Sequence, residues 1–290
     1  PRKYTVDYLR GGYILYQNPG SDISSLYADH PVIASETSKV LASLYGKSHH
    51  IQALAFNSGI GAADAILDVL AARSLQSQSI NLVPSSCWIE ISRRIKSGRS
   101  DLFHFYDDND LEQIVSSLSE KDIQSIFIEP IQNNPTMQVL DIQKLINSLK
   151  SNPPKDNVFI IIDHVMTFDF DVFSKFKEWG WPKNVTVVAF ISGIKFLQYG
   201  IDAGKCGFVI ANKGHESDEL FHELIEHRAG TGKSPSYEDL MYANLDTSRS
   251  IHSRMARYDR NMKYMTESLS NKIKNYATVI SPGLTKHTQH

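Results

Sequence analysis

The sequence predicts an α/β fold in three layers, with helices on both faces of a mostly parallel β-sheet. Short apolar runs rich in Val, Ile and Phe predict buried strands. These runs alternate along the chain with helix-like or polar stretches, which is the order expected when helices connect parallel strands. The 290 residues suffice for one large domain and a smaller one.

The first elements can be placed in order. Residues 1–34 are polar and rich in Tyr and Gly, which predicts an extended arm. Residues 35–45 have helical periodicity and precede Gly46, which ends the helix. A strand at 52–56 and a turn at 57–59 lead into a second helix, because apolar residues then recur on one helical face. Further strands are expected at 80–83, 125–128, 158–162, 185–191 and 207–211.

The last part of the chain predicts a long amphipathic helix. Apolar residues recur there at steps of three and four, namely Ile251, Met255, Tyr258, Met262, Met265 and Leu269. A helix of about five turns would bridge two domains or pack on the core, since the apolar stripe is too short for a coiled coil. We therefore expect an arm and first helix over 1–50, a large α/β domain over 51–245, and a bridging helix with the beginning of a C-terminal domain over 246–290. Because the chain lacks an initiator Met and a closing element, we expect it to be part of a longer polypeptide.

Composition limits the classes of partner. A net charge of −2 gives no electrostatic reason to expect nucleic acid or an anionic membrane as partner. No apolar run approaches the roughly 20 residues of a membrane span. Only Cys87 and Cys206 occur, which favours a reducing, cytoplasmic compartment and argues against a disulfide framework or a metal site built on cysteine.

The turn Asn57-Ser-Gly-Ile-Gly61 is a candidate phosphate site. It follows a strand and opens a helix, where free backbone N–H groups and the helix dipole favour anions. It departs from the dinucleotide fingerprint, since Asp64 replaces the third glycine and the acidic ribose-binding residue is missing. An NAD site is therefore disfavoured, while a tight turn that serves only helix packing remains an alternative.

Two charged residues stand at the ends of apolar runs. Asp163 ends one run, and Ser192-Gly-Ile-Lys195 follows another. Burial would desolvate the Lys195 amine and leave it partly neutral, as a nucleophile requires. A strand-end lysine and aspartate are the two groups that an enzyme dependent on pyridoxal 5′-phosphate needs. A serine–lysine pair of the β-lactamase type is disfavoured, because Ser-Asp-Asn and Lys-Thr-Gly are absent. His164 lies beside Asp163 without metal-ligand spacing, and we interpret it as a packing residue.

Taken in order, these motifs resemble the fold-type-I pyridoxal phosphate enzymes of cysteine and methionine metabolism, such as the cystathionine γ-synthases and γ-lyases. The matching pieces are Tyr13 with Asn18-Pro19, Asn57-Ser58-Gly59-Ile60-Gly61-Ala62, Glu129-Pro130 with Asn134-Pro135, Asp163-His164, Ser192-Gly193-Ile194-Lys195, Gly200-Ile-Asp202, Gly230-Thr-Gly-Lys-Ser-Pro235 and Ser281-Pro-Gly-Leu284. The likeness covers nearly the whole chain. It implies the three-layer fold with the start of a small C-terminal α+β domain.

The resemblance also implies site residues. Lys195 would form the Schiff base with the cofactor, and Asp163 would pair with the pyridine nitrogen. Ser58, Gly59, Ile60 and Ser192 would hold the phosphate, with Tyr13 arriving from a neighbouring subunit. Glu129 and Asn134 would lie beside the ring, and Trp88 would stack on it in place of the family's tyrosine. The segment that bears the substrate-carboxylate arginine would lie beyond residue 290.

Three departures predict a divergent member. Leu15 replaces an arginine that binds phosphate, and Ile194 replaces the threonine before the lysine. Trp88 can stack on a pyridine ring, but it lacks an acidic hydroxyl for proton transfer.

The expected activity is β- or γ-elimination or γ-replacement on an amino acid through a Lys195 aldimine, by a cytoplasmic homodimer or tetramer. The alternatives are a pyridoxal phosphate-dependent aminotransferase or decarboxylase, a non-catalytic scaffold that keeps the fold, and an α/β protein with none of this chemistry.

Overall fold

The computed structural model describes residues 31–45, 50–107, 115, 118, 122–135, 137–167, 171–195, 197–199, 202–243 and 248–275. Several predicted features lie outside these residues. They are the arm with Tyr13 and Leu15, the pair Gly200-Ile201, and Ser281-Leu284.

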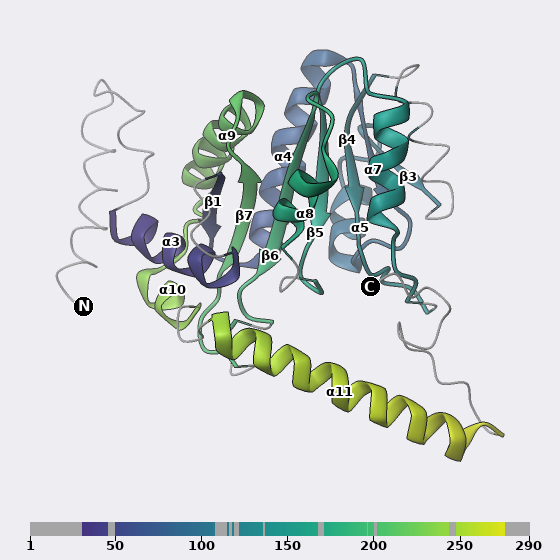
Figure 1. Ribbon diagram of the computed structural model, residues 1–290. Helices are drawn as coiled ribbons and strands as arrows, with labels where there is room; N and C mark the ends of the chain where they lie inside the picture. The colour runs from purple at the N-terminus through teal and green to yellow at the C-terminus, as the bar shows by residue number, and fades with distance from the viewer. Residues whose placement is uncertain are drawn as a thin grey trace.

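A seven-stranded sheet forms the centre of the described chain (Figure 1). Its strands are β1 (Ile51–Phe56), β2 (Ile80–Pro84), β3 (Phe103–Tyr106), β4 (Ile123–Ile128), β5 (Val158–Asp163), β6 (Val185–Ser192) and β7 (Gly207–Asn212). They are ordered β1-β7-β6-β5-β4-β2-β3, and β7 is antiparallel to both of its neighbours while the other pairs are parallel. The predicted mostly parallel sheet is confirmed.

Helices cover both faces of this sheet. On one face lie α4 (Gly59–Ser77), α5 (Ile89–Lys96) and α9 (His215–Thr231), whose apolar residues share one core cluster. On the other face lie α3 (Pro31–Tyr45), α7 (Ile142–Ser151), α8 (Val172–Trp179) and α10 (Tyr237–Ala243). The chain therefore has the three layers that the sequence predicts.

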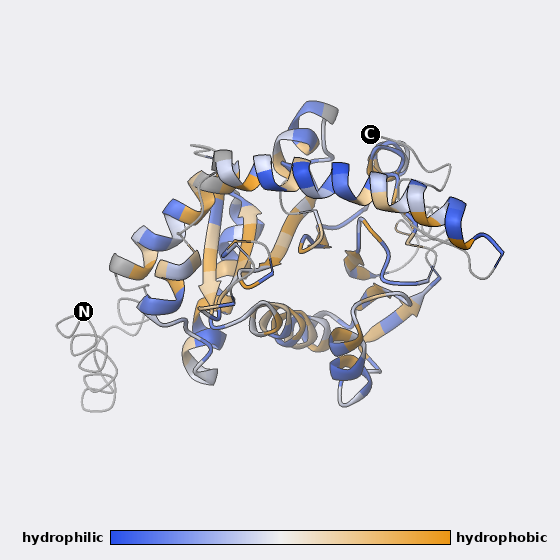
Figure 2. Cartoon of the chain, turned by 90° about the horizontal axis from the view of Figure 1, so that it is seen from below, coloured by the Kyte–Doolittle hydropathy of each residue, from blue (hydrophilic) through white to orange (hydrophobic). Residues whose placement is uncertain are grey.

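The strand β5 shows why its sequence is continuously apolar. Val158, Ile160 and Ile162 pack into one core cluster, while Phe159 and Ile161 pack into the other. Successive side chains of a strand point to opposite faces, so a strand between two helical layers has no polar face. Figure 2 accordingly shows strands that are mostly orange and helices of mixed colour.

Several predicted boundaries differ from the structure. The first helix begins at Pro31 rather than at residue 35, and proline is well tolerated in a first helical turn. The strand β3 was not predicted, because it is only four residues long and its His104 is exposed.

The long helix α11 (Ser248–Ile273) is present, and it is longer than predicted. Its Ile251 is buried in the core, but Met262 and Met265 are each 53% exposed. The apolar stripe as a whole therefore does not pack on the core of the described chain, and the role of the helix as a bridge between two domains stays a prediction. No helix within the described residues is both long and apolar enough to span a membrane.

Candidate functional site

The candidate site lies at one edge of the sheet. Because β1, β2, β4, β5 and β6 run in the same direction, their carboxyl ends meet at this edge. Ser58, Trp88, Glu129 and Lys195 follow four of these ends, and Asp163 is the last residue of β5. Five residues widely separated in sequence therefore reach the edge at which open α/β sheets bind ligands.

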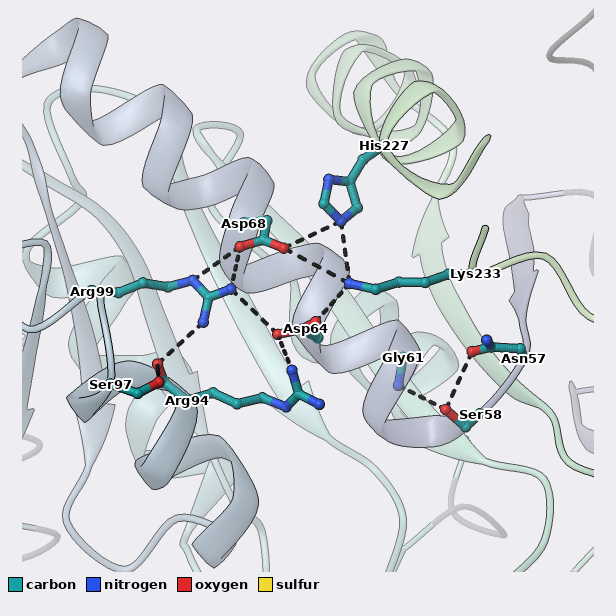
Figure 3. A network of polar contacts seen from close by, with 10 residues as sticks. All are labelled: Asn57, Ser58, Gly61, Asp64, Asp68, Arg94, Ser97, Arg99, His227 and Lys233. Carbon is teal, nitrogen blue, oxygen red and sulfur yellow. Dashed lines mark hydrogen bonds and ion pairs between the residues drawn. The ribbon is translucent and has the colours of Figure 1, made fainter. Parts of the chain in front are cut away.

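The turn after β1 forms the first helical turn of α4. Ser58 is the N-cap, and its Oγ accepts the Gly61 N–H at 3.0 Å (Figure 3). The N–H groups of Gly59 and Ile60 lie in this turn, where the helix has no preceding acceptor to offer them. Together with the positive end of the helix dipole, these donors make an anion cradle.

This turn packs directly on the ends of β6 and β7. A Cβ atom added at Gly59 would lie 2.6 Å from the Ser192 Cβ, and one added at Gly207 would lie 2.3 Å from the Ser58 carbonyl oxygen. Both separations are shorter than any side chain allows, so only glycine permits the approach. The approach brings the Ser192 hydroxyl beside the cradle, and its role as a phosphate ligand stays a prediction.

The lysine and the tryptophan meet across the sheet edge. Lys195 follows β6 on a turn, and its Nζ lies 5.3 Å from the centre of the Trp88 ring, within cation–π range. Glu129 Oε1 accepts the Trp88 N–H at 2.6 Å, and Glu129 Oε2 accepts the Asn133 N–H at 3.2 Å. Glu129 is itself buried, so it fixes the start of α5 and with it the tryptophan.

Lys195 is exposed, which contradicts the expectation of a buried amine. The Trp88 ring over which its Nζ lies is itself 40% exposed.

Asp163 behaves differently. Burial raises the pKa of its carboxyl from 3.8 to about 6, although the Val165 N–H and the charge of Lys195 both lower it. The carboxyl is therefore held in a place that favours its neutral form unless a further cation approaches.

His164 packs in the core, as interpreted from the sequence. It is fully buried, its ring is stacked with that of Tyr45 at 6.3 Å, and its Nδ1 lies 2.8 Å from Thr167 Oγ1. Asn134 forms hydrogen bonds to Gln132 and Met137 within its own loop. Tyr13 lies outside the described residues.

The sequence did not reveal a group of charges behind the cradle. Asp64, which we had noted only as a misfit to the dinucleotide fingerprint, is 6% exposed and is paired with Lys233 at 2.6 Å. The Lys233 carbonyl oxygen accepts the Asn57 N–H at 2.8 Å, so this residue touches both sides of the turn. The sequence signal for this group is a pair of aspartates, Asp64 and Asp68, which lie one helical turn apart in a helix that is otherwise largely apolar.

Comparison with known proteins identifies the family. The family model "Cys/Met metabolism PLP-dependent enzyme" matches residues 34–290. No curated protein sequence is significantly similar to this chain.

Solved structures with this fold include enzymes of two kinds. Cystathionine γ-synthase from Xanthomonas oryzae pv. oryzae, in complex with aminoacrylate and cysteine, has a TM-score of 0.61 and 17% identity over 90% of this chain and 61% of its own. Yeast cystathionine γ-lyase has a TM-score of 0.56 and 21% identity, over 82% of this chain and 56% of its own. An aromatic-amino-acid aminotransferase from Burkholderia pseudomallei, covalently bound to pyridoxal phosphate, has a TM-score of 0.61 and 13% identity. The match covers 87% of this chain and 67% of the aminotransferase.

At these identities the likeness shows the fold. The chain spans about three fifths of the length of the cystathionine enzymes it matches.

The residues at the sheet edge fit pyridoxal phosphate. The Gly59–Ser192 contact places a hydroxyl beside the helix N–H donors, which is the donor set that a phosphate requires. The partly buried Asp163 can receive a cationic ring nitrogen, and Lys195 is an amine within electrostatic reach of it.

The close packing at Gly207 predicts how much an added methyl group lowers the stability of the protein. Gly207→Ala should destabilise the protein by about 1–3 kcal/mol, because the new Cβ meets backbone atoms that cannot rotate away. Gly98→Ala is the matched control, since its Cβ would meet nothing within 4 Å, and it should stay within about 1 kcal/mol of the parent. Urea unfolding measures both, and equal stabilities for the two variants would contradict this account of the packing.

The raised pKa of Asp163 predicts a pH-dependent cost to stability. An acid that holds its proton more tightly in the folded state destabilises the fold above its unfolded pKa, and the full cost is reached above about pH 6. The stability of Asp163→Asn relative to the parent should therefore rise between pH 4 and pH 7, by up to about 3 kcal/mol.

Urea unfolding without added ligand tests this expectation. Asp156→Asn, at an exposed position, serves as the control. A stability difference for Asp163→Asn that stays flat across this pH range would refute the assigned burial.

Proposed function

The chain belongs to the Cys/Met metabolism PLP-dependent enzymes, and from that premise we propose that it catalyses β- or γ-elimination or γ-replacement on an amino acid. One observation carries the proposal. The glycine-dependent contact of the α4 turn with Ser192 puts an anion cradle at the same sheet edge as Lys195 and Asp163. These are the three things that the cofactor requires of its protein: a phosphate site, an amine and a partner for the ring nitrogen.

The cradle would hold the phosphate. The N–H groups of Gly59 and Ile60 point out of the first turn of α4, and the Ser58 and Ser192 hydroxyls flank it. Tyr13, from a neighbouring subunit, would add a further donor. A dianionic phosphate at this position is also stabilised by the helix dipole.

The strand ends would hold the ring. Asp163 would accept a hydrogen bond from the protonated ring nitrogen, and that positive charge would lower the pKa of the carboxyl again and favour its ionised form. Trp88 would stack on the ring, at the angle set by Glu129, and Asn134 would border it. Bound pyridoxal phosphate supplies a ring that accepts the electrons released when a bond at the substrate α-carbon breaks.

Lys195 would bind the cofactor covalently. Its Nζ would then act as the base that takes up the α-proton of the substrate. Because Lys195 is exposed in the single chain, this role requires that the cofactor and a second subunit cover it. The proposal therefore includes a homo-oligomer with a shared site. We place it in the cytoplasm, since Cys87 and Cys206, the two cysteines of the sequence, are both buried and are too few for a disulfide framework.

The proposed substrates are sulfur-containing or O-activated amino acids. The replacement of a tyrosine by Trp88 removes an acidic hydroxyl beside the ring, so the leaving group has to depart without help from that residue. A specialised replacement reaction is therefore as consistent with Trp88 as a general elimination is.

A second candidate function is transamination. The fold is shared with an aromatic-amino-acid aminotransferase at a TM-score of 0.61, equal to that of the cystathionine γ-synthase. Product analysis separates the two. Elimination releases a 2-oxo acid together with ammonia and the leaving group, whereas transamination retains the amino group on the protein.

The lysine predicts a spectroscopic signature. The parent protein mixed with pyridoxal phosphate should develop an absorption band in the violet region, and Lys195→Ala should not, because its side chain has no amine. Lys183→Ala removes an exposed lysine away from the sheet edge and should keep the band. A folded parent without any band would favour the scaffold alternative, and a band retained by Lys195→Ala would move the attachment elsewhere.

The shared site predicts complementation between two inactive variants. Lys195→Ala and Tyr13→Ala homo-oligomers should each bind the cofactor poorly. Mixed dimers contain one site with both native residues, so about a quarter of the sites should recover after mixing and re-equilibration of equal amounts. Titration of the violet band measures this recovery, and a stable monomer in gel filtration would remove the role of Tyr13.

A further inference from the structure

Six charged or titratable residues form a connected group on the outer side of α4 (Figure 3). Asp64 and Asp68 lie one turn apart on this helix, and the cations reach them from both sides. The group consists of Asp64, Asp68, Arg94, Arg99, His227 and Lys233. None of these residues has a part in the proposed chemistry.

Asp64 is the centre of the group. One of its oxygens is paired with Arg94 at 2.8 Å and with Arg99 at 3.3 Å, and the other is paired with Lys233 at 2.6 Å. The charges of these cations lower the pKa of the Asp64 carboxyl, although its burial opposes them. Asp64 is therefore a buried anion that depends on its partners.

The second carboxylate extends the group to α9. Asp68 is paired with Arg99, and its other oxygen lies 3.3 Å from His227 Nε2 and 3.8 Å from Lys233 Nζ. Burial lowers the pKa of His227, and the charge of Lys233 lowers it further, so the ring can accept a hydrogen bond from the lysine at 3.3 Å. These contacts connect α4 to the segment that follows α9.

Lys233 also connects the group to the cradle. Its ammonium holds Asp64 in the second turn of α4, while its carbonyl oxygen holds the N–H of Asn57 at 2.8 Å. Asn57 directly precedes the N-cap, and its Oδ1 accepts a hydrogen bond from Ser58 Oγ at 3.3 Å. Lys233 thus contacts the chain both before the anion-binding turn, at Asn57, and after it, at Asp64.

We propose that Lys233 is a positioning residue for the phosphate cradle: by holding Asp64 and Asn57 together, it sets where the first turn of α4 lies against Ser192. The inference rests on the proposed function, because it assumes that the cradle binds the cofactor phosphate. Hydrogen-bond donors in a rigid turn lose affinity when their support lets them shift by a fraction of an ångström.

The test compares two ligands that differ only in the phosphate. Dissociation constants for pyridoxal 5′-phosphate and for phosphate-free pyridoxal are measured by titration of the 290-residue chain. Lys233→Met should weaken the binding of pyridoxal 5′-phosphate about tenfold and leave that of pyridoxal within about twofold. Lys233→Arg should restore most of the loss, because it keeps a cation beside Asp64. Lys183→Met, at an exposed position, should bind both ligands as the parent does.

A double variant keeps the test valid if Lys233→Met does not fold. Asp64→Asn with Lys233→Met removes the connection together with the buried negative charge that Lys233 helps to balance, and it should show the same loss specific to the phosphate. Asp64→Asn alone should reproduce most of that loss, since the two residues act through one contact.

The outcomes separate the two proposals. An equal loss for both ligands, or no loss for either, overturns the role of Lys233 while the parent still binds pyridoxal 5′-phosphate. A parent that binds pyridoxal 5′-phosphate no better than pyridoxal overturns the cradle itself. A parent that binds neither ligand overturns the proposed function, and the inference with it.

Discussion

The contact between the first turn of α4 and the ends of β6 and β7 is the constraint on which the candidate site depends. The turn approaches so closely that Gly59 and Gly207 have no room for a Cβ atom. This approach directs the helix N–H groups to the sheet edge and brings Ser192 alongside them. Lys195 lies only three residues further along the chain, so the same contact fixes the start of the turn that carries the lysine. In the proposed function, one packing interaction therefore positions both the phosphate site and the amine.

The fold treats Asp163 and Lys195 in opposite ways. Asp163 lies at the end of a strand covered on both faces, and burial raises the pKa of its carboxyl to about 6 even with Lys195 near it. Lys195 is exposed and lies against a single aromatic ring. A partly buried carboxylate with too little positive charge around it is prepared to receive a cation, whereas the exposed amine still has to be covered before it can act as a nucleophile. This division of burial suits a site that is completed by its cofactor.

The sequence predicted the parts of the fold that local patterns determine. The continuous apolar runs of β5 and β6 located those strands within about one residue, because a strand between two helical layers has no polar face. The short edge strand β3 carries an exposed His104, so its pattern is too weak to detect. The exposure of Lys195 and the pairing of Asp64 were not predictable. Both depend on tertiary contacts, and Lys233 is 169 residues away from Asp64.

The described residues that differ from the family's pattern lie in one part of the site, near the lysine and the proposed position of the ring, whereas the α4 turn keeps its features. The α4 turn keeps its cap, its glycine contacts and the Ser192 hydroxyl, and a group of charges holds it from behind. The replacements within the described residues, Ile194 and Trp88, instead remove a hydroxyl before the lysine and a hydroxyl beside the ring. In the proposed site Ile194 offers the phosphate no hydroxyl, so the remaining donors of the turn become more important, and a cradle with fewer ligands has to be held more rigidly to keep its affinity. The buried Asp64–Lys233 pair supplies that rigidity, which connects the divergence at the sheet edge to the charges behind it.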